Sequence, residues 1–237
     1  MLEEIHALDQ NKTWELVHLP DNKKAIGCKW VYSVKLKSDG SLERLKARLV
    51  AKGYAQTYGI DYSETFSPVA KMTSIRIFIS LAAKNDWVLH QLDIKNAFLH
   101  GDLAEEVYME QPPGFVAQGE YGKVCKLKKS LYGLKQSPRA WFGKFSQAIE
   151  KFGMKQRKAD HSVFYRNEKG ILILLIVYVD DIIITGNDGS GISALKTFIH
   201  SQFHTKELGE LKYFLGIEVI RENGKICLSV VTEKIYS

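Results

Sequence analysis

The chain has 237 residues, 45% of them hydrophobic and 25% charged, a composition typical of a globular protein with one large or two modest cores. Its net charge of +6 is compatible with a polyanionic partner, and its three widely separated cysteines exclude a disulfide framework and a C-x-x-C zinc site. The apolar run 171–179 is too short for a bilayer, which needs about 20 residues. The N-terminus has neither a basic leader nor an apolar signal core, so we expect no membrane association.

The first quarter of the chain predicts a short amphipathic helix and an extended segment within residues 1–24, followed by a β-hairpin over 26–54 with its turn at 38–40. On the second strand of this hairpin, basic side chains including Lys46 and Arg48 recur with period 2 and share one face. Such a face is either a solvated edge strand protected by charge or a surface that contacts phosphate. The residues alone leave both readings open.

Two Ser-Pro pairs, at Ser67 and Ser137, predict helix starts with serine as the N-cap and proline at the first position. Apolar residues at helical spacing follow each pair. Between these helices we expect a strand over 87–94, which ends near Asp93, and an irregular connection or extended arm over 100–124.

The last third predicts strands at 163–165, 171–179 and 182–185, a helix near 192–203 and a hairpin over 212–230. The segment Asp188-Gly-Ser-Gly191 is expected to be a flexible loop, because no G-K-[ST] sequence follows it. Antiparallel strands alternating with helices predict an α+β fold, a ferredoxin-like antiparallel sheet with helices on one face.

Two adjacent carboxylates, Asp180 and Asp181, stand inside the most apolar stretch of the chain. Burying two like charges side by side is costly, so this pattern predicts a strand–turn–strand that presents both to a cation. Asp93 is the best third ligand, because it also ends an apolar strand; alternatively, it caps that strand and pairs with Lys95. Three carboxylates would suit two Mg²⁺ ions, which prefer hard oxygen ligands.

Segments in a fixed order carry a resemblance to a known family: Cys28-Lys-Trp-Val-Tyr, Lys46-Ala-Arg-Leu-Val-Ala-Lys-Gly-Tyr, Gly59-Ile-Asp-Tyr, Glu64-Thr-Phe-Ser-Pro-Val, Gln91-Leu-Asp-Ile-Lys-Asn-Ala-Phe-Leu, Ser130-Leu-Tyr-Gly-Leu-Lys-Gln-Ser-Pro-Arg, Tyr178-Val-Asp-Asp and Tyr213-Phe-Leu-Gly-Ile-Glu. Together they make the chain similar to the reverse transcriptase of copia-type long-terminal-repeat retrotransposons. Tyr-Val-Asp-Asp alone would be a weak signal, whereas the ordered set is specific.

The resemblance implies the fingers and palm of a right-hand polymerase, with the thumb largely absent. Residues 1–72 and 101–136 would be fingers-like. Residues 73–100 and 137–237 would form the palm, with the catalytic turn and a hairpin that resembles a primer grip. Truncation before a thumb could impair activity by abolishing processivity.

The resemblance also implies site residues. The catalytic and metal-binding residues would be Asp93, Asp180 and Asp181, with two Mg²⁺ ions or, alternatively, Mn²⁺. The nucleotide-binding residues would be Lys46, Arg48, Phe98, Gly133 and Ser137. Phe98 would exclude a 2′-hydroxyl by its bulk, and either Lys46 or Arg48 would meet the triphosphate. The primer and template contacts would be Tyr178, Tyr213, Leu215 and Gly216, with Tyr132 also near bases or sugars.

The implied activity is that of an RNA-directed DNA polymerase, which uses dNTP and a primer on an RNA or DNA template. The implied context is a larger Gag-Pol polyprotein of a transposable element, a cytoplasmic virus-like particle and a pathway that ends in DNA integration. Two alternatives stay open: a catalytically inactive fragment that binds nucleic acid, and a two-metal nuclease. The nuclease is disfavoured because it needs neither Phe98 nor the hairpin at 212–230.

Overall fold

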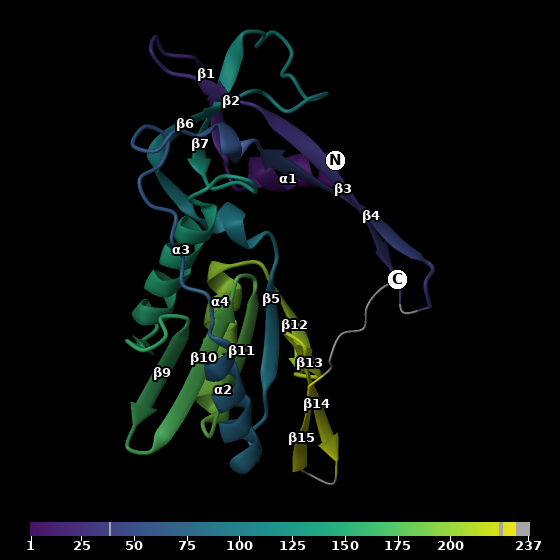
Figure 1. Ribbon diagram of the computed structural model, residues 1–237, viewed down its shortest axis with the longest axis vertical. Coiled ribbons are helices and arrows are strands. Elements are labelled where there is room, and N and C mark those ends of the chain that lie inside the picture. The colour runs from purple at the N-terminus through teal and green to yellow at the C-terminus, as the bar shows by residue number, and fades with distance from the viewer. Residues whose placement is uncertain (38, 223–224, 231–237) are drawn as a thin grey trace. The chain divides into compact units, whose positions relative to one another are not determined.

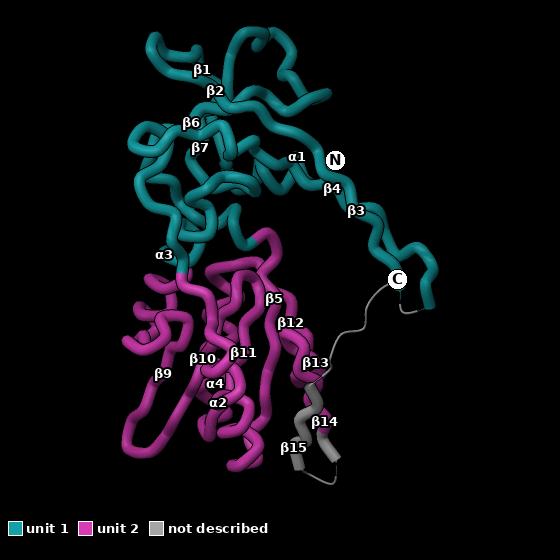
Figure 2. Tube along the Cα trace, viewed as in Figure 1, with its two compact units in different colours: residues 1–67, 97–144 teal, residues 68–96, 145–237 magenta. Residues whose placement is uncertain are grey.

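The computed structural model describes residues 1–37, 39–222 and 225–230, with side chains up to residue 220 (Figure 1). The chain divides into two compact units: unit 1 holds residues 1–67 and 97–144, and unit 2 holds residues 68–96 and 145–237 (Figure 2). Within the described part of the chain, no helix combines the length and the apolar character needed to cross a membrane.

Unit 1 is built on a four-stranded sheet with the order β1 (Trp14–His18), β7 (Lys123–Lys129), β6 (Asp102–Met109) and β2 (Ala25–Ile26). It also contains helix α1 (Leu2–Gln10) and the short helices η1 (Gly53–Ala55) and η2 (Ala97–His100). The expectation of an irregular arm over 100–124 is wrong for β6. A register shift between Asp102 and Val107 interrupts the pairing of β6 with β7. The sequence of β6 accordingly lacks a regular alternation of apolar and polar residues.

A separate two-stranded ribbon in unit 1 pairs β3 (Cys28–Leu36) with β4 (Leu42–Ala51) and projects from the rest of that unit (Figure 1). Its register places Val31 opposite Arg48 and Ser33 opposite Lys46, so the basic side chains share one face as predicted. The base of the ribbon is anchored in the core of unit 1. The buried residues of that core include Leu8, Leu49, Met109 and Leu131.

Unit 2 contains a six-stranded sheet in which every neighbouring pair is antiparallel (Figure 1). Its order is β12 (Thr205–Glu210), β5 (His90–Ile94), β11 (Asp181–Gly186), β10 (Ile171–Tyr178), β9 (Val163–Glu168) and β8 (Lys155–Gln156). Strand β10 pairs with both β9 and β11, which places its apolar run near the middle of the sheet.

The prediction that helices cover one face of this sheet is wrong. Helix α2 (Met72–Lys84) packs in a core with Ile176 and Ile183. On the opposite face Phe145, in the unit 2 part of α3 (Ser137–Lys151), contacts Phe164, with ring centroids 6.1 Å apart. Strand β10 can be covered on both sides because consecutive residues in its run point to opposite faces and are all apolar.

The ends of two elements also differ from expectation. Helix α2 begins at Met72 rather than at Pro68, and the backbone N–H of Lys71 before it donates to Asp160 Oδ2 (3.0 Å), a cap supplied from a distant part of the chain. The C-terminal hairpin comprises β13 (Tyr213–Phe214), β14 (Ile217–Glu222) and β15 (Lys225–Val230). Its predicted turn at 223–224 lies outside the described residues.

Candidate active site

The acidic pair lies at the hairpin between β10 and β11, where Tyr178 is paired with Asp181 across a two-residue turn formed by Val179 and Asp180. Val179 has φ = 56°, which is unusual for a β-branched residue and stores strain in the backbone. The backbone N–H of Ile94 in β5 donates to the carbonyl oxygen of Asp180 (2.8 Å). Strand β5, which pairs with β11, therefore holds the turn on the β11 side.

Asp93 lies directly opposite Asp181, because β5 and β11 pair antiparallel in that register. Paired residues in such a ladder project their side chains to the same face of the sheet. Gln91, two residues earlier on β5, shares this face and donates from Nε2 to Asp181 Oδ1 (3.2 Å). The sheet thus gathers Asp93, Asp181 and a polar donor at one place, next to the turn that carries Asp180.

The three carboxylates are electrostatically coupled. Burial raises the pKa of Asp181, the negative charges of Asp180 and Asp93 raise it further, and the hydrogen bond from Gln91 opposes the increase. Within the described ranges, no three His, Cys, Asp or Glu residues are arranged closely enough to hold a metal ion. The aspartates are therefore near one another without forming a closed ligand set, and their oxygen donors match the ligand preference of Mg²⁺.

Tyr178 and the β13–β14 hairpin lie close to the acidic turn. Tyr178 makes an edge contact with Phe214, with ring centroids 6.3 Å apart. The hairpin turn consists of Leu215 (φ = 47°) and Gly216 (φ = 82°), and a positive φ at both positions is typical of a type I′ turn. Tyr213 is exposed beside it. This arrangement leaves Tyr213 accessible to a ligand, while Leu215 packs against the core of unit 2.

Three predicted residues of unit 1 form a row. The guanidinium of Arg48 lies over the ring of Tyr132 (5.3 Å to the centroid), and Tyr132 makes an edge contact with Phe98 at 5.2 Å between centroids. Lys46 lies two residues further along the same face of β4. Burial lowers the pKa of Lys46, and the nearby positive charge of Arg48 lowers it further. The row runs from the cation of Arg48 through the ring of Tyr132 to the ring of Phe98.

Gly133 lies where the segment that follows β7 meets the end of β4. The N–H of Ala51 donates to the carbonyl oxygen of Tyr132 (2.8 Å), and Gly133 has φ = 91°. A methyl group at Gly133 would overlap the carbonyl oxygen of Ala51 and come within 2.7 Å of Val50 Cγ1. Only glycine permits this close approach, which holds Tyr132 beside Arg48.

Ser137 is buried at the start of α3, and its hydroxyl donates to the carbonyl oxygen of Leu131 (2.6 Å). The side chain therefore links the two ends of the 131–137 segment rather than accepting a helix N–H as an N-cap. Any contact between this residue and a ligand would come from the backbone at the start of the helix.

Sequence reasoning missed a buried amide pair beside this segment. Gln56 and Gln136 are 5% and 2% exposed, and Gln56 Nε2 donates to Gln136 Oε1 (2.9 Å). Gln56 Oε1 also accepts the backbone N–H of Lys135 (2.9 Å), and Gln136 Nε2 donates to the carbonyl oxygen of Asp61 (2.9 Å). These bonds tie the 53–62 loop to the 131–137 segment. Glutamine in a loop has no periodicity that could have signalled the pair.

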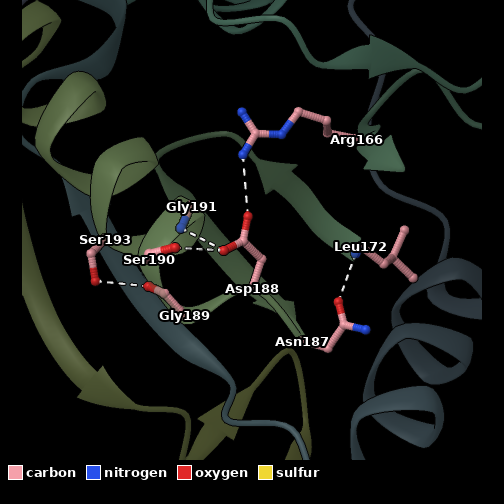
Figure 3. Close-up of polar contacts among 8 residues, drawn as sticks. All are labelled: Arg166, Leu172, Asn187, Asp188, Gly189, Ser190, Gly191 and Ser193. Atoms are coloured by element: carbon pink, nitrogen blue, oxygen red, sulfur yellow. Dashed lines mark hydrogen bonds and ion pairs between the residues drawn. The ribbon is translucent and has the colours of Figure 1, made fainter. Parts of the chain in front are cut away.

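The Asp188 segment is ordered as the first turn of α4 (Gly189–Gln202), so the expectation of a flexible loop is wrong (Figure 3). Asp188 Oδ1 accepts from the Gly191 N–H (2.8 Å) and the Ser190 hydroxyl (2.9 Å), and these bonds, with Arg166 nearby, lower the pKa of Asp188. This is a helix N-cap at the end of β11 away from the acidic turn. Its observed role is structural support at the start of α4.

The chain is similar to known proteins of one family. The family described as reverse transcriptase (RNA-dependent DNA polymerase) matches residues 11–234. The chain is 46% identical over 235 residues to the retrovirus-related Pol polyprotein from transposon TNT 1-94 of Nicotiana tabacum, which covers 99% of this chain and 18% of that polyprotein. It is 48% identical over 219 residues to the one from transposon RE1 of Arabidopsis thaliana (92% and 15% covered). It is 31% identical over 238 residues to the transposon Ty1-ER2 Gag-Pol polyprotein of Saccharomyces cerevisiae (94% and 13% covered). The chain thus spans less than a fifth of the length of these relatives.

Proposed function

The chain belongs to the reverse transcriptase (RNA-dependent DNA polymerase) family found in retrotransposon Pol polyproteins, and on this premise we propose that it joins deoxynucleotides to a primer 3′-hydroxyl on an RNA or DNA template. The observation that carries the proposal is the position of Asp93 directly opposite Asp181, with Asp180 on the adjoining turn. A reaction that transfers a phosphoryl group needs concentrated positive charge at the reacting oxygens, and three coupled carboxylates are suited to recruit it.

Asp93, Asp180 and Asp181 are the residues that would hold Mg²⁺ or Mn²⁺. Burial raises the pKa of Asp181, and the negative charges of Asp180 and Asp93 raise it further, so a bound cation would be favoured at this place. When bound, two such ions stabilise the attacking and the leaving oxygens of the transfer. The chain's own contribution is to keep the carboxylates on facing strands, with Gln91 donating a hydrogen bond to Asp181.

We assign the triphosphate contact to Arg48 rather than Lys46, because Arg48 lies over Tyr132 and Tyr132 contacts Phe98. In this row the ring of Tyr132 lies between the cation and Phe98, which marks the proposed sugar position. The rigid ring of Phe98 would leave no space for a 2′-hydroxyl, so deoxynucleotides would be preferred over ribonucleotides. An arginine fork also suits two oxygens of a phosphate better than a lysine does.

The remaining predicted contacts have backbone or aromatic roles. Gly133 is exposed and lets a ligand approach the main chain closely, and Ser137 would act through the first N–H groups of α3, which favour anions. Tyr178, with the hairpin residues Tyr213, Leu215 and Gly216, would contact the primer end.

We further propose that unit 1 corresponds to the fingers and unit 2 to the palm of a right-hand polymerase. The chain would act as part of a larger Gag-Pol polyprotein and inside a virus-like particle, as expected for a retrotransposon enzyme. The basic face of the β3–β4 ribbon would supply salt-dependent contacts to nucleic acid phosphates.

Primer extension tests the proposal. We expect wild-type protein to extend oligo(dT) on poly(rA) with dTTP and Mg²⁺ or Mn²⁺, and Asp180→Asn to abolish the extension. Binding of the primer–template without extension would instead support an inactive nucleic-acid-binding fragment. Shortening of the primer would support a nuclease.

A further inference from the structure

One face of the β3–β4 ribbon is lined with aliphatic and aromatic residues. The register that gathers the basic side chains on one face puts a second set on the other, which we call the apolar face. It consists of Trp30, Tyr32, Val34, Leu36, Leu42, Leu45, Ala47 and Leu49. Val34 pairs with Leu45 and Leu36 pairs with Leu42, while Glu43 is the extra residue at the register shift. Both strands therefore contribute aliphatic side chains to the same surface.

The base of the apolar face is covered by other parts of unit 1. Leu49 is buried in one core with Leu8 of α1, and the ring of Trp30 contacts that of Phe115, with centroids 5.6 Å apart. Farther out, the ribbon extends away from the rest of unit 1 (Figure 1). The residues of this outer part are 56% to 73% exposed: Tyr32, Val34, Leu36, Leu42 and Leu45. A two-stranded ribbon on its own is marginally stable in water, so a partner that covers this part would stabilise it.

The exposed part of the apolar face is large enough for a protein interface. At roughly 100 Å² for each exposed side chain, one ribbon presents about 500 Å² of apolar surface. Monomeric proteins rarely leave a larger apolar patch uncovered. Two such faces in contact would bury about 1,000 Å² in total, which is the lower end of the range for specific complexes. A contact of this size would be weak, with a Kd in the micromolar range.

The distribution of charge favours a second copy of the chain as the occupant. The cations of the ribbon lie on its other face: Lys29, Lys35, Arg44, Lys46 and Arg48. Nucleic acid phosphates would be held there rather than on the apolar face. When two apolar faces pack about 10 Å apart, the basic side chains of the two copies point away from each other, roughly 20 Å apart, and salt screens their repulsion. The apolar face is also uniform across both strands, so a copy turned by a two-fold rotation presents a matching surface.

We propose that the apolar face of the β3–β4 ribbon is a dimerisation surface, which packs against the same face of a second copy of this chain about a two-fold axis. In the dimer the aliphatic side chains of both ribbons are removed from water, and both basic faces stay open to nucleic acid. The inference goes beyond the proposed function and does not depend on it, because the dimer would form without nucleotide, primer or metal ion.

Sedimentation velocity of the nuclease-treated protein over about 1–100 μM tests the inference. We expect the weight-average mass to rise from that of one chain toward that of two, with a Kd of about 10 μM. Raising NaCl from about 0.15 M to about 0.5 M should leave this Kd unchanged or lower it, because the contact is apolar and the like charges are screened. Association through residual nucleic acid would instead be lost at the higher salt.

Two variants locate the contact. Leu45→Glu puts a charge at the most exposed position of the apolar face and should raise the dimer Kd at least about tenfold. The matched control is Ile77→Glu on α2, an equivalent change at a residue that is 58% exposed in unit 2, and it should change the Kd less than about twofold. If Leu45→Glu does not fold, hydroxyl-radical labelling of the wild-type protein decides the matter. Labelling of Val34 and Leu45 should fall as the protein concentration rises, while labelling of Ile77 stays constant.

A wild-type protein that stays monomeric at about 100 μM would overturn the inference and leave the apolar face to another protein or to another part of a longer polyprotein. So would an unchanged Kd in Leu45→Glu, an equal loss in Ile77→Glu, or an association that higher salt abolishes. Constant labelling of Val34 and Leu45 would overturn it as well. These outcomes are distinct from a failure of the proposed function, in which the protein does not extend a primer whatever its oligomeric state.

Discussion

Replacing Gln56 with alanine should loosen the connection between the 53–62 loop and the 131–137 segment. The truncation removes the acceptor for the Lys135 N–H and the donor to Gln136 Oε1, both at 2.9 Å. Each buried polar group left unpaired costs about 1–3 kcal/mol, so two of them give an expected loss of about 2–4 kcal/mol once water partly fills the space. Because the 131–137 segment carries Tyr132 and Gly133, the Kd for dTTP should also rise.

Hydrogen exchange at the Lys135 amide, together with urea unfolding, measures this loss. The matched control is Gln118→Ala, which removes an exposed glutamine and should change the free energy of unfolding by less than about 0.5 kcal/mol. If Gln56→Ala left both the exchange rate at Lys135 and the unfolding free energy equal to those of the control, the amide pair would not fasten the two segments.

Three further changes have definite expected results. Because burial raises the pKa of Asp181 in the folded state, its ionised form opposes folding, so stability falls as pH rises through that pKa. Asp181→Asn should therefore raise the melting temperature at pH 7, while extension is lost. A lower melting temperature at pH 7 would contradict this reasoning. Phe98→Ala should let UTP compete better with dTTP, measured as the ratio of kcat/KM values, and an unchanged ratio would reject Phe98 as the sugar gate. Gly133→Ala should destabilise by at least about 1–2 kcal/mol from the positive φ alone, checked by thermal unfolding, and neutrality would mean that the contact with Ala51 can relax freely.

The hairpin at 171–186 was predictable from the sequence because its signals are local. An apolar run, two adjacent aspartates and a second apolar run specify a strand–turn–strand without any distant contact. The family was also predictable from the ordered segments, and the matches to transposon Pol polyproteins confirm it. The pairing of Asp93 with Asp181 joins residues far apart in the sequence. The sequence could suggest this pairing only because each aspartate stands at the end of an apolar strand.

Other features depend on contacts that no local pattern reports. The run 173–177 is apolar at every position, which signals a strand covered on both faces. The prediction assumed that only one face was covered, so it placed α2 and α3 on the same side of the sheet. The caps by Asp160 and Asp188 depend on loop geometry. Glu4 lies in a mostly polar helix, so no pattern in the sequence predicts that its side chain is buried.

The most direct test of the central claim is a double-mutant cycle at Asp93 and Asp181 in single-turnover primer extension with saturating Mg²⁺. If the two carboxylates serve one centre, Asp93→Asn and Asp181→Asn should each lower the rate by about 10³-fold or more, and the double variant should be no slower than the worse single variant. Near-wild-type extension by Asp93→Asn, or losses that multiply in the double variant, would contradict a shared centre across β5 and β11.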